Sequence, residues 1–402
     1  MGTIIDIGKK AVVKKPELLA PAGNLEKLTI AFAFGADAVY VGGKVFGLRK
    51  YADNFSIKEL QDGIRIANEH GKKVYVVLNG FAHNVDIEAL SHHLIELQAI
   101  QPHGLIISDM GVFQLAKSLT SIPLHVSTQA SVTNAYTAKI WKDAGASRVI
   151  LAREVSIEDC QTIQKHVDIE LEVFVHGSMC ASYSGKCVIS NYTSGRDSNR
   201  GGCVQSCRHV FDITSSHQKD VDSTHIMNAQ DLNAITLVPQ LIEAGIASLK
   251  IEGRMKSNLY VATTVQAYRH AIDHYPNAPT PLLNEHLSRV SNRTFSTGGL
   301  ASRPKGDSIN YTFGGYSKSI EFVGNVIQNS SEDGMILAVQ SPFQKNEPLH
   351  LLTPNGALPL PTDSLQTLDR APLNTSKPNS LVRLSFVSDV HPHHVAYKHI
   401  RA

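Results

Sequence analysis

ELLAPAG, at residues 17–23, is a short apolar run that ends abruptly in glycine, and a helical stretch follows it. The same pattern recurs along the chain as far as Glu252. These runs are apolar without alternation, which indicates strands buried on both faces, as in a parallel sheet. The other seven runs are AVYVGG (38–43), VYVVLN (74–79), GLIISD (104–109), LHVSTQ (124–129), RVILARE (148–154), LEVFVHG (171–177) and LKIEGR (249–254).

Helix candidates lie between the predicted strands, for example IKELQDGIRIANEH (57–70), IEALSHHLIELQAI (87–100) and NAYTAKIWKDAGA (134–146). Eight strands that alternate with helices predict an α/β fold, a (β/α)8 barrel of the TIM type. An open, doubly wound sheet is the alternative. No GxGxxG motif follows the first strand, which weighs against a dinucleotide-binding sheet.

The sequence texture changes after residues 256–273, which are predicted to form the closing helix of the barrel. We therefore expect a barrel over residues 1–275 and a helical or loop linker over 276–314. Residues 315–402 are expected to form a small antiparallel β-barrel domain, because strand-like runs alternate there with turns. These runs are SIEFVGNVIQ (319–328), GMILAVQ (334–340), PLHLLTP (348–354) and LVRLSFV (381–387).

The composition is that of an ordinary globular protein, with 42% hydrophobic residues, 18% charged residues and a net charge of +2. This charge does not by itself indicate a polyanionic partner, although a local basic surface can lie within a balanced total. No stretch reaches the roughly 18 uninterrupted apolar residues of a membrane span, and no secretory signal is recognisable. Five cysteines in such a chain favour reduced thiols and a cytoplasmic location.

Polar residues stand at the ends of the predicted strands. The C-terminal strand ends of a (β/α)8 barrel share one face, and the chemistry of such enzymes lies there. Arg153 and Glu154 are equally compatible with a structural ion pair, and His125 is more consistent with a core histidine than with a ligand. The residues predicted to share this rim are Asn79, Asp109, Ser127, Thr128, Gln129, Arg153, Glu154, His176, Glu252 and Arg254.

Four of the five cysteines lie in one segment, residues 178–210, directly after the seventh predicted strand. Cys180, Cys187, Cys203 and Cys207 form the pattern C-x6-C-x15-C-x3-C. The intervening residues are polar and rich in glycine, so the loop can wrap a compact centre, and Lys186, Arg196 and Arg200 would favour thiolates. The spacing is compatible with an iron–sulfur cluster, and zinc, disulfides or unliganded cysteines stay open as alternatives. Cys160 is expected to be a core thiol, and His391, His393 and His394 to lie in a solvated loop.

The stretch EVFVHGSMCASYSGKCVIS, residues 172–190, resembles the signature of the collagenase-like peptidase U32 family. The resemblance extends along nearly the whole chain, through STQASV, RDSNRGGCVQSCR, IMNAQDL and SLKIEGRMKS into the tail at FVGNV and LLTPNG. Within that family the chain is most similar to the tRNA hydroxylation protein P branch. The signature positions are filled by Glu172, Phe174, Gly177, Ser178, Met179, Cys180, Gly185, Cys187, Ile189 and Ser190.

The resemblance implies an enzyme that makes 5-hydroxyuridine at the tRNA wobble position, without molecular oxygen and with prephenate as a small-molecule substrate. It implies an iron–sulfur cluster, of the 4Fe-4S type, on Cys180, Cys187, Cys203 and Cys207, with zinc as the alternative metal. The catalytic positions that it suggests are Arg153, Glu154, His176, Glu252 and Arg254. The substrate-binding positions that it suggests are Arg49, Asn54, Gln129, Lys250 and Lys256.

Two other classes of function stay open. A peptidase or collagenase-like hydrolase is suggested by the family label, but the chain has no HExxH and no GxSxG motif. An accessory factor of an oxygen-independent hydroxylation pathway is the second alternative. If the partner is tRNA, basic residues of the cysteine segment and of the last barrel helix are candidate phosphate contacts, and Tyr183 and Tyr192 are candidate stacking residues.

Overall fold

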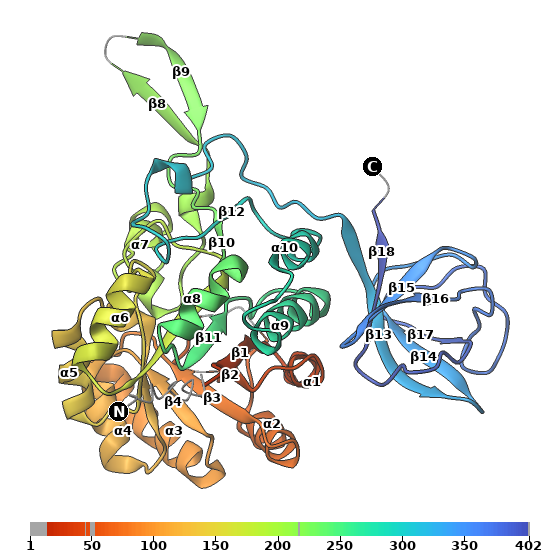
Figure 1. Ribbon diagram of the computed structural model, residues 1–402, viewed down its shortest axis with the longest axis horizontal. Helices are drawn as coiled ribbons and strands as arrows, with labels where there is room; N and C mark the ends of the chain where they lie inside the picture. Colours follow the sequence, from red (N-terminus) through yellow and green to blue (C-terminus); the bar gives the residue numbers. More distant parts are fainter. Residues whose placement is uncertain (1–13, 45, 49–52, 216–217, 401–402) are drawn as a thin grey trace, which may run out of the picture.

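The computed structural model describes residues 14–44, 46–48, 53–215 and 218–400. Its centre is a ring of eight parallel strands in sequence order, and the ring closes because β11 pairs with both β7 and β1 (Figure 1). The predicted barrel is confirmed, and the open-sheet alternative is wrong. The strands are β1 (Glu17–Pro21), β2 (Ala38–Gly42), β3 (Lys73–Leu78), β4 (Gly104–Ile107), β5 (Leu124–Val126), β6 (Arg148–Ile150), β7 (Glu170–Gly177) and β11 (Ser248–Ile251).

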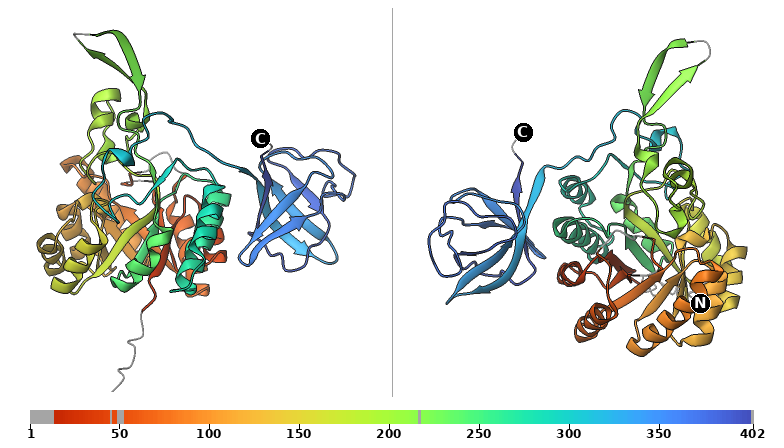
Figure 2. Two further views of the ribbon diagram at one scale, coloured as in Figure 1. Left: turned by 45° about the horizontal axis from the view of Figure 1, so that its top comes forward. Right: turned by 180° about the vertical axis from the view of Figure 1, so that it is seen from behind.

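Helices cover the outside of the ring (Figure 2). Several helices begin at a residue whose side chain caps the first turn. Ser56 and Ser156 are such N-caps, because their side chains accept hydrogen bonds from the backbone of the first helical turn. Asp109, a predicted rim residue, is the N-cap of α4. The helices are α1 (Leu25–Ala33), α2 (Ile57–Glu69), α3 (Ile87–Ile100), α4 (Met110–Leu119), α5 (Ala135–Ala144), α6 (Ile157–His166), α8 (Val238–Glu243) and α9 (Asn258–Asp273).

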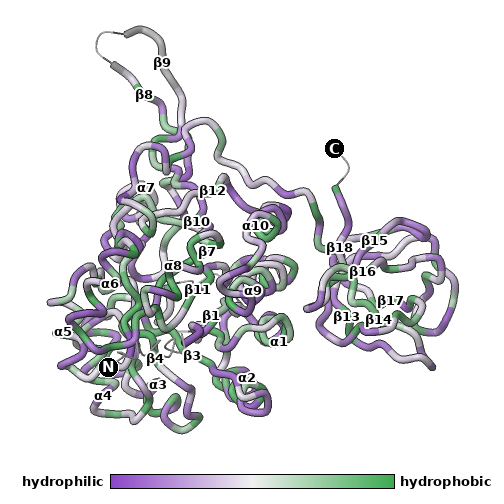
Figure 3. The backbone as a smooth tube through the Cα atoms, in the orientation of Figure 1, coloured by the Kyte–Doolittle hydropathy of each residue, from purple (hydrophilic) through white to green (hydrophobic). Residues whose placement is uncertain are grey.

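Hydrophobic residues concentrate along the barrel strands, whereas hydrophilic and hydrophobic residues alternate along the surrounding helices (Figure 3). The main core fills the space between strands and helices, while a small inner cluster around Tyr40, Tyr75 and Phe174 fills the ring. Burial lowers the pKa of His125 to about 3, and its ring lies 4.7 Å from the Tyr75 ring, so it is the neutral core histidine that the sequence favours. Among the described residues, no helix has both the length and the apolar character needed to cross a membrane.

A charged layer closes the ring below that inner cluster. Arg148 Nη1 donates to Glu17 Oε1 at 2.6 Å and to Glu172 Oε2 at 3.1 Å, and Lys250 Nζ donates to Glu172 Oε1 at 2.9 Å. Tyr75 donates its hydroxyl to the other oxygen of Glu17, at 2.8 Å. Buried charges need such mutual pairing, because an isolated one would lose its hydration without compensation.

Residues after β7 add elements to the top of the barrel. β8 (Phe211–Ser215) and β9 (Gln218–Thr224) form a hairpin that projects from the barrel (Figure 1). β10 (Asp231–Asn233) pairs antiparallel with the end of β7, and β12 (Phe295–Ser296) pairs with β10. The two further helices are α7 (Ile189–Ser194) and α10 (Thr280–Ser288). Short 3-10 helices are η1 (Asn84–Asp86), η2 (Thr128–Ala130), η3 (Ser198–Arg200), η4 (Ser206–Arg208), η5 (Ile235–Leu237) and η6 (Gly306–Ser308).

The C-terminal residues form a separate antiparallel sheet in the order β16-β15-β18-β13-β14-β17, which curls around its own core (Figure 2). All four predicted strands are present, and β16 and β18 were not predicted. Val395 and Tyr397 belong to the barrel core cluster, and Asn325 Nδ2 donates to Glu26 Oε1 at 2.6 Å, so the sheet packs on the side of α1 and α9. The strands are β13 (Ile320–Ser330), β14 (Gly334–Val339), β15 (Leu349–Thr353), β16 (Gly356–Leu360), β17 (Leu381–Leu384) and β18 (Val395–His399).

Candidate active site

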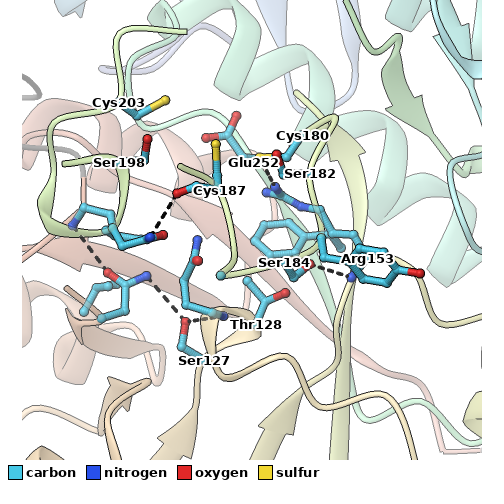
Figure 4. Close-up of a pocket in the computed structure, with 18 of the residues that line it drawn as sticks. Ser127, Thr128, Arg153, Cys180, Ser182, Ser184, Cys187, Ser198, Cys203 and Glu252 are labelled. Atoms are coloured by element: carbon cyan, nitrogen blue, oxygen red, sulfur yellow. Dashed lines mark hydrogen bonds between the residues drawn. The ribbon is translucent and has the colours of Figure 1, made fainter. Parts of the chain in front are cut away.

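One pocket lies at the C-terminal ends of the barrel strands, beneath the cysteine segment (Figure 4). All four cysteines of the predicted cluster line it, together with five of the predicted catalytic and substrate-binding residues. The fold therefore brings thiols and charged side chains from distant parts of the sequence into one cavity. The nine predicted site residues that line this pocket are Gln129, Arg153, Cys180, Cys187, Cys203, Cys207, Lys250, Glu252 and Arg254.

The four thiols face a shared space. Burial raises the pKa of the Cys207 thiol, and the neighbouring Cys180, Cys203 and Cys187 raise it further, while the positive charge of Arg208 opposes the rise. Cys180 and Cys203 are exposed, and Cys187 and Cys207 are partly so. Burial also raises the pKa of the isolated Cys160 to about 12 within α6, which fits the expected core thiol.

A close backbone approach holds the cysteine segment on the barrel rim. Gly185 has a φ of +74°, and a Cβ there would lie 2.0 Å from the carbonyl oxygen of Gln129, so no larger residue fits without displacing the loop. Asn199 Nδ2 donates to the carbonyl oxygen of Cys187 at 3.0 Å. These contacts fix the positions from which Cys180 and Cys187 enter the pocket.

Glu154 fixes the same loop through Ser184. The Ser184 backbone N–H donates to Glu154 Oε1 at 3.0 Å, and the Arg153 backbone N–H donates to Ser184 Oγ at 3.1 Å. Ser131 Oγ donates to the Ser184 carbonyl oxygen as well. Glu154 does not line the pocket, so the geometry gives it a positioning role for the cysteine segment, and its predicted catalytic role stays a prediction.

Arg153 turns toward the thiols instead of toward Glu154. Its Nη1 donates to Cys180 Sγ at 3.3 Å, and its guanidinium lies 4.5 Å from the centre of the Phe174 ring. Its Nε is buried without a hydrogen-bond partner among the described residues. No ion pair joins Arg153 to Glu154 in the described part of the chain. The arginine therefore supplies positive charge beside a candidate metal-binding sulfur.

Lys250 forms the charged floor of the pocket. Its Nζ bonds to Glu172 and lies 4.5 Å from the centre of the Tyr40 ring. Burial lowers the pKa of Lys250, and the Glu172 carboxylate opposes that shift. The lysine links the pocket to the charged layer that closes the barrel.

Replacing Lys250 by Met should destabilise the fold. The change leaves Glu172 buried with Arg148 as its remaining partner, and we expect the free energy of unfolding to fall by about 3 kcal/mol. Urea unfolding measures this, with the exposed Lys165 on α6 changed to Met as the control. Equal stability of the two variants would show that the charged layer does not depend on Lys250.

Arg254 and Asn54 meet above Gly42, the last residue of β2. A Cβ on Gly42 would lie 1.8 Å from Arg254 Nη1 and 2.8 Å from Asn54 Oδ1. Asn54 lines a neighbouring pocket, with Arg200 on its wall, and Arg254 lines the main one. Arg200 itself is bound to Asp86, at 2.6 Å from Nη1 to Oδ2, so its charge is directed to that carboxylate.

His176 and Lys256 lie outside the main pocket. β7 has a bulge between Phe174 and His176, where it carries one residue more than the paired part of β11. The bulge turns the His176 ring outward, between the rings of Tyr260 and Tyr268. Burial, with a smaller contribution from the charge of Lys256, lowers the pKa of His176 to about 3, so the ring is neutral. The residue is only 1% exposed. Lys256 Nζ donates to the Ser291 carbonyl oxygen at 2.9 Å. The predicted roles of both residues stay predictions, and Arg49 lies outside the described residues.

The described residues contain no group of three or more His, Cys, Asp or Glu side chains placed to hold a single metal ion. This applies to His391, His393 and His394, where His394 Nδ1 instead accepts from the His391 backbone at 3.2 Å. It applies to the thiols too. A tetrahedral zinc ion with Zn–S distances of about 2.3 Å would hold its sulfurs about 3.8 Å apart. All four thiols nevertheless line the main pocket.

Some residues of the pocket were not predicted to act there. Tyr40, Phe174 and Ser184 line it, and Glu172 supports it from below. Glu172, Phe174 and Ser184 all lie within the quoted stretch 172–190, so the signature contained the signal, although spacing alone gave them no role.

The model of peptidase family U32 matches residues 23–310, which include the whole cysteine segment and nearly all of the barrel. The chain belongs to peptidase family U32. Among its relatives, the U32 chain is 41% identical to "tRNA hydroxylation protein P1" of Bacillus subtilis (strain 168) over 360 residues, 86% of this chain and 85% of that protein. It is 36% identical to "tRNA hydroxylation protein P" of Escherichia coli (strain K12) over 396 residues, 85% of this chain and 87% of that protein.

A third relative carries a different substrate in its name. The "23S rRNA 5-hydroxycytidine C2501 synthase" of Escherichia coli (strain K12) is 35% identical over 258 residues. That match covers 64% of this chain and 39% of the relative.

Proposed function

We propose that this U32 protein is an RNA-modifying enzyme that hydroxylates carbon 5 of the wobble uridine in tRNA. The names of its relatives support RNA hydroxylation. The two tRNA hydroxylation proteins match over most of both chains, which supports tRNA as the substrate class. The observation that carries the proposal is the pocket, where four thiols and the cations of Arg153, Lys250 and Arg254 face one cavity.

Cys180, Cys187, Cys203 and Cys207 would hold an iron–sulfur cluster of the 4Fe-4S type. The donor set fits, because such a cluster takes four thiolates and presents a different iron atom to each, so its sulfurs need not converge on one point. Arg153 fits as well, since its Nη1 already donates to the Cys180 sulfur. When bound, the cluster supplies electron-transfer chemistry to the pocket. Zinc is the alternative metal on the same four thiols.

The protein side chains bind and orient the substrates. Arg254 and Lys250 provide positive charge for the carboxylates of prephenate, the small-molecule substrate that we propose. Asn79, Ser127 and Gln129 also line the pocket and would supply the donors and acceptors that a uracil edge requires. The rings of Tyr40 and Phe174 add apolar surface around the Lys250 ammonium at the floor of the pocket.

The peptidase alternative lacks a histidine base in this pocket. Several serines and cysteines line it, but none of its described lining residues is His or Asp. His125 and His176 are both buried and neutral, and neither reaches the pocket. The Ser–His and Cys–His pairs with which most serine and cysteine proteases activate their nucleophile are therefore not formed by the described lining residues.

Nucleoside analysis tests the proposed function. Mass spectrometry of tRNA from a strain without this protein should show no 5-hydroxyuridine or its derivatives, and expression of the wild-type chain should restore them. A matched assay of peptide and gelatin hydrolysis should show no activity. Unchanged tRNA nucleosides in the deletion strain, in the absence of a second copy of the gene, would contradict the proposal.

A further inference from the structure

Residues 303–318, here called the strap, connect the barrel to the C-terminal sheet. The strap leaves the base of the β8–β9 hairpin and arches across to β13 (Figures 1 and 2). Most of its residues are exposed. The strap is part of no sheet and forms only isolated β-bridges. Its exposed side chains therefore do not pack within a sheet, and they are free to contact a partner.

Hydrogen bonds fix the strap beside the cysteine segment. Asn228 is fully buried, and its Nδ2 donates to the carbonyl oxygens of Asn310 at 3.2 Å and Phe313 at 3.0 Å. Arg208 Nη1 donates to Asn228 Oδ1 at 3.0 Å, and Arg208 directly follows Cys207. The strap is thus attached to the segment that carries the candidate cluster ligands.

A second attachment lies at the pocket rim. The Tyr316 ring has Lys256 Nζ 4.1 Å and the Arg293 guanidinium 4.3 Å from its centre. Tyr316 lines a small pocket together with Glu252, and Glu252 also lines the main pocket. The strap therefore lines a pocket that shares Glu252 with the candidate active site.

The outer surface of the strap combines aromatic rings with positive charge. Tyr311 is 47% exposed and Phe313 is 48% exposed, so about half of each side chain is accessible to solvent. Arg303, Lys305 and Lys318 are exposed and form no ion pair with any described residue, and Asp307 is the single acidic residue of the strap. Base stacking on aromatic rings together with cationic contacts to phosphates is the general mode of single-strand binding.

We propose that the strap binds an unpaired RNA segment that flanks the nucleotide in the pocket, with bases stacked on Tyr311 and Phe313 and phosphates at Arg303, Lys305 and Lys318. This inference rests on the proposed function, since it assumes an RNA substrate. RNA fits the strap better than an acidic protein partner does. Unpaired RNA offers bases for the aromatic rings and phosphates for the cations, whereas an acidic protein surface would engage mainly the cations. The strap lies outside the cysteine segment. The net charge of the chain, +2, gives no indication of this RNA-binding surface.

The test compares binding of a fluorescent RNA stem-loop, with an unpaired loop, to the full-length protein and its variants. Changing Tyr311 and Phe313 to Ala should weaken binding on the order of 10-fold for each stacked base that is lost. Phe313→Trp should keep the affinity, because the ring is retained. The matched control is Tyr136→Ala on α5, a ring that is 85% exposed on the barrel wall. Lys305→Glu should weaken binding and Lys165→Glu should not.

The outcomes separate the two proposals. If the wild-type protein binds the stem-loop and the Tyr311/Phe313 double variant binds it equally well, the strap inference is wrong and the proposed function stands. The strap inference would also be overturned if the Tyr311/Phe313 double variant lost the same affinity for the stem-loop and for a duplex of the same strand. Paired bases cannot stack on the rings, so the duplex should be unaffected by their loss. If the wild-type protein binds no RNA, both proposals fail. Unchanged thermal unfolding of the variants excludes a folding defect.

Discussion

Each of Cys180→Ala, Cys187→Ala, Cys203→Ala and Cys207→Ala should lose nearly all bound iron and all hydroxylated uridine in tRNA. All four thiols line one pocket, and removal of one thiolate leaves one iron atom of the cluster without its protein ligand. Iron content after anaerobic purification and tRNA nucleoside analysis in a complemented deletion strain measure the two losses.

Cys160→Ala is the matched control for this series. Cys160 is fully buried in α6, away from the pocket, so the variant should lose some stability and keep its iron. Retention of iron by any one of the four pocket variants would remove that cysteine from the ligand set. Loss of iron in Cys160→Ala, with the fold intact, would contradict the site as a whole.

Gly42→Ala should lower uridine hydroxylation on the order of 100-fold while the fold survives. The new Cβ would lie 1.8 Å from Arg254 Nη1, so the guanidinium must leave its place in the pocket. The end of a flexible side chain moves at little cost to stability, whereas an active-site group displaced by about 1 Å costs much of the rate. The amount of modified nucleoside made per unit time by the variant measures the effect.

A double variant shows whether Gly42 acts through Arg254. If it does, Gly42→Ala combined with Arg254→Lys should be no worse than Arg254→Lys alone, because the guanidinium is already lost. Additive losses would instead point to Asn54, whose Oδ1 would lie 2.8 Å from the same new Cβ. If Gly42→Ala hydroxylates uridine at the wild-type rate, the placement of the Arg254 guanidinium does not matter for the reaction.

The barrel could be predicted because its strands are buried on both faces and therefore form continuous apolar runs separated by helical stretches. IEALSHHLIELQAI coincides with α3, and the eight apolar runs coincide with the eight ring strands. The shorter elements could not be predicted. GALPL, which forms β16, contains a proline, and the three-residue β10 is a strand only because it pairs with the bulged end of β7. The domain boundaries at residues 275 and 315 stay predictions.

The candidate site was predictable where it depends on strand ends and on the cysteine spacing. The position of His176 along β7 did not suffice to predict which face of the strand its side chain occupies. Alternation would place it on the same face as Glu172 and Phe174, and the bulge before it reverses that face. The strap also could not be inferred, because exposure of Tyr311 and Phe313 depends on the hydrogen bonds of the distant Asn228.

The metal content of the wild-type protein, purified without oxygen, tests the central claim most directly. We predict a brown protein with about four iron atoms and about four acid-labile sulfides per chain, and with little zinc. Stoichiometric zinc without iron or sulfide would contradict the account.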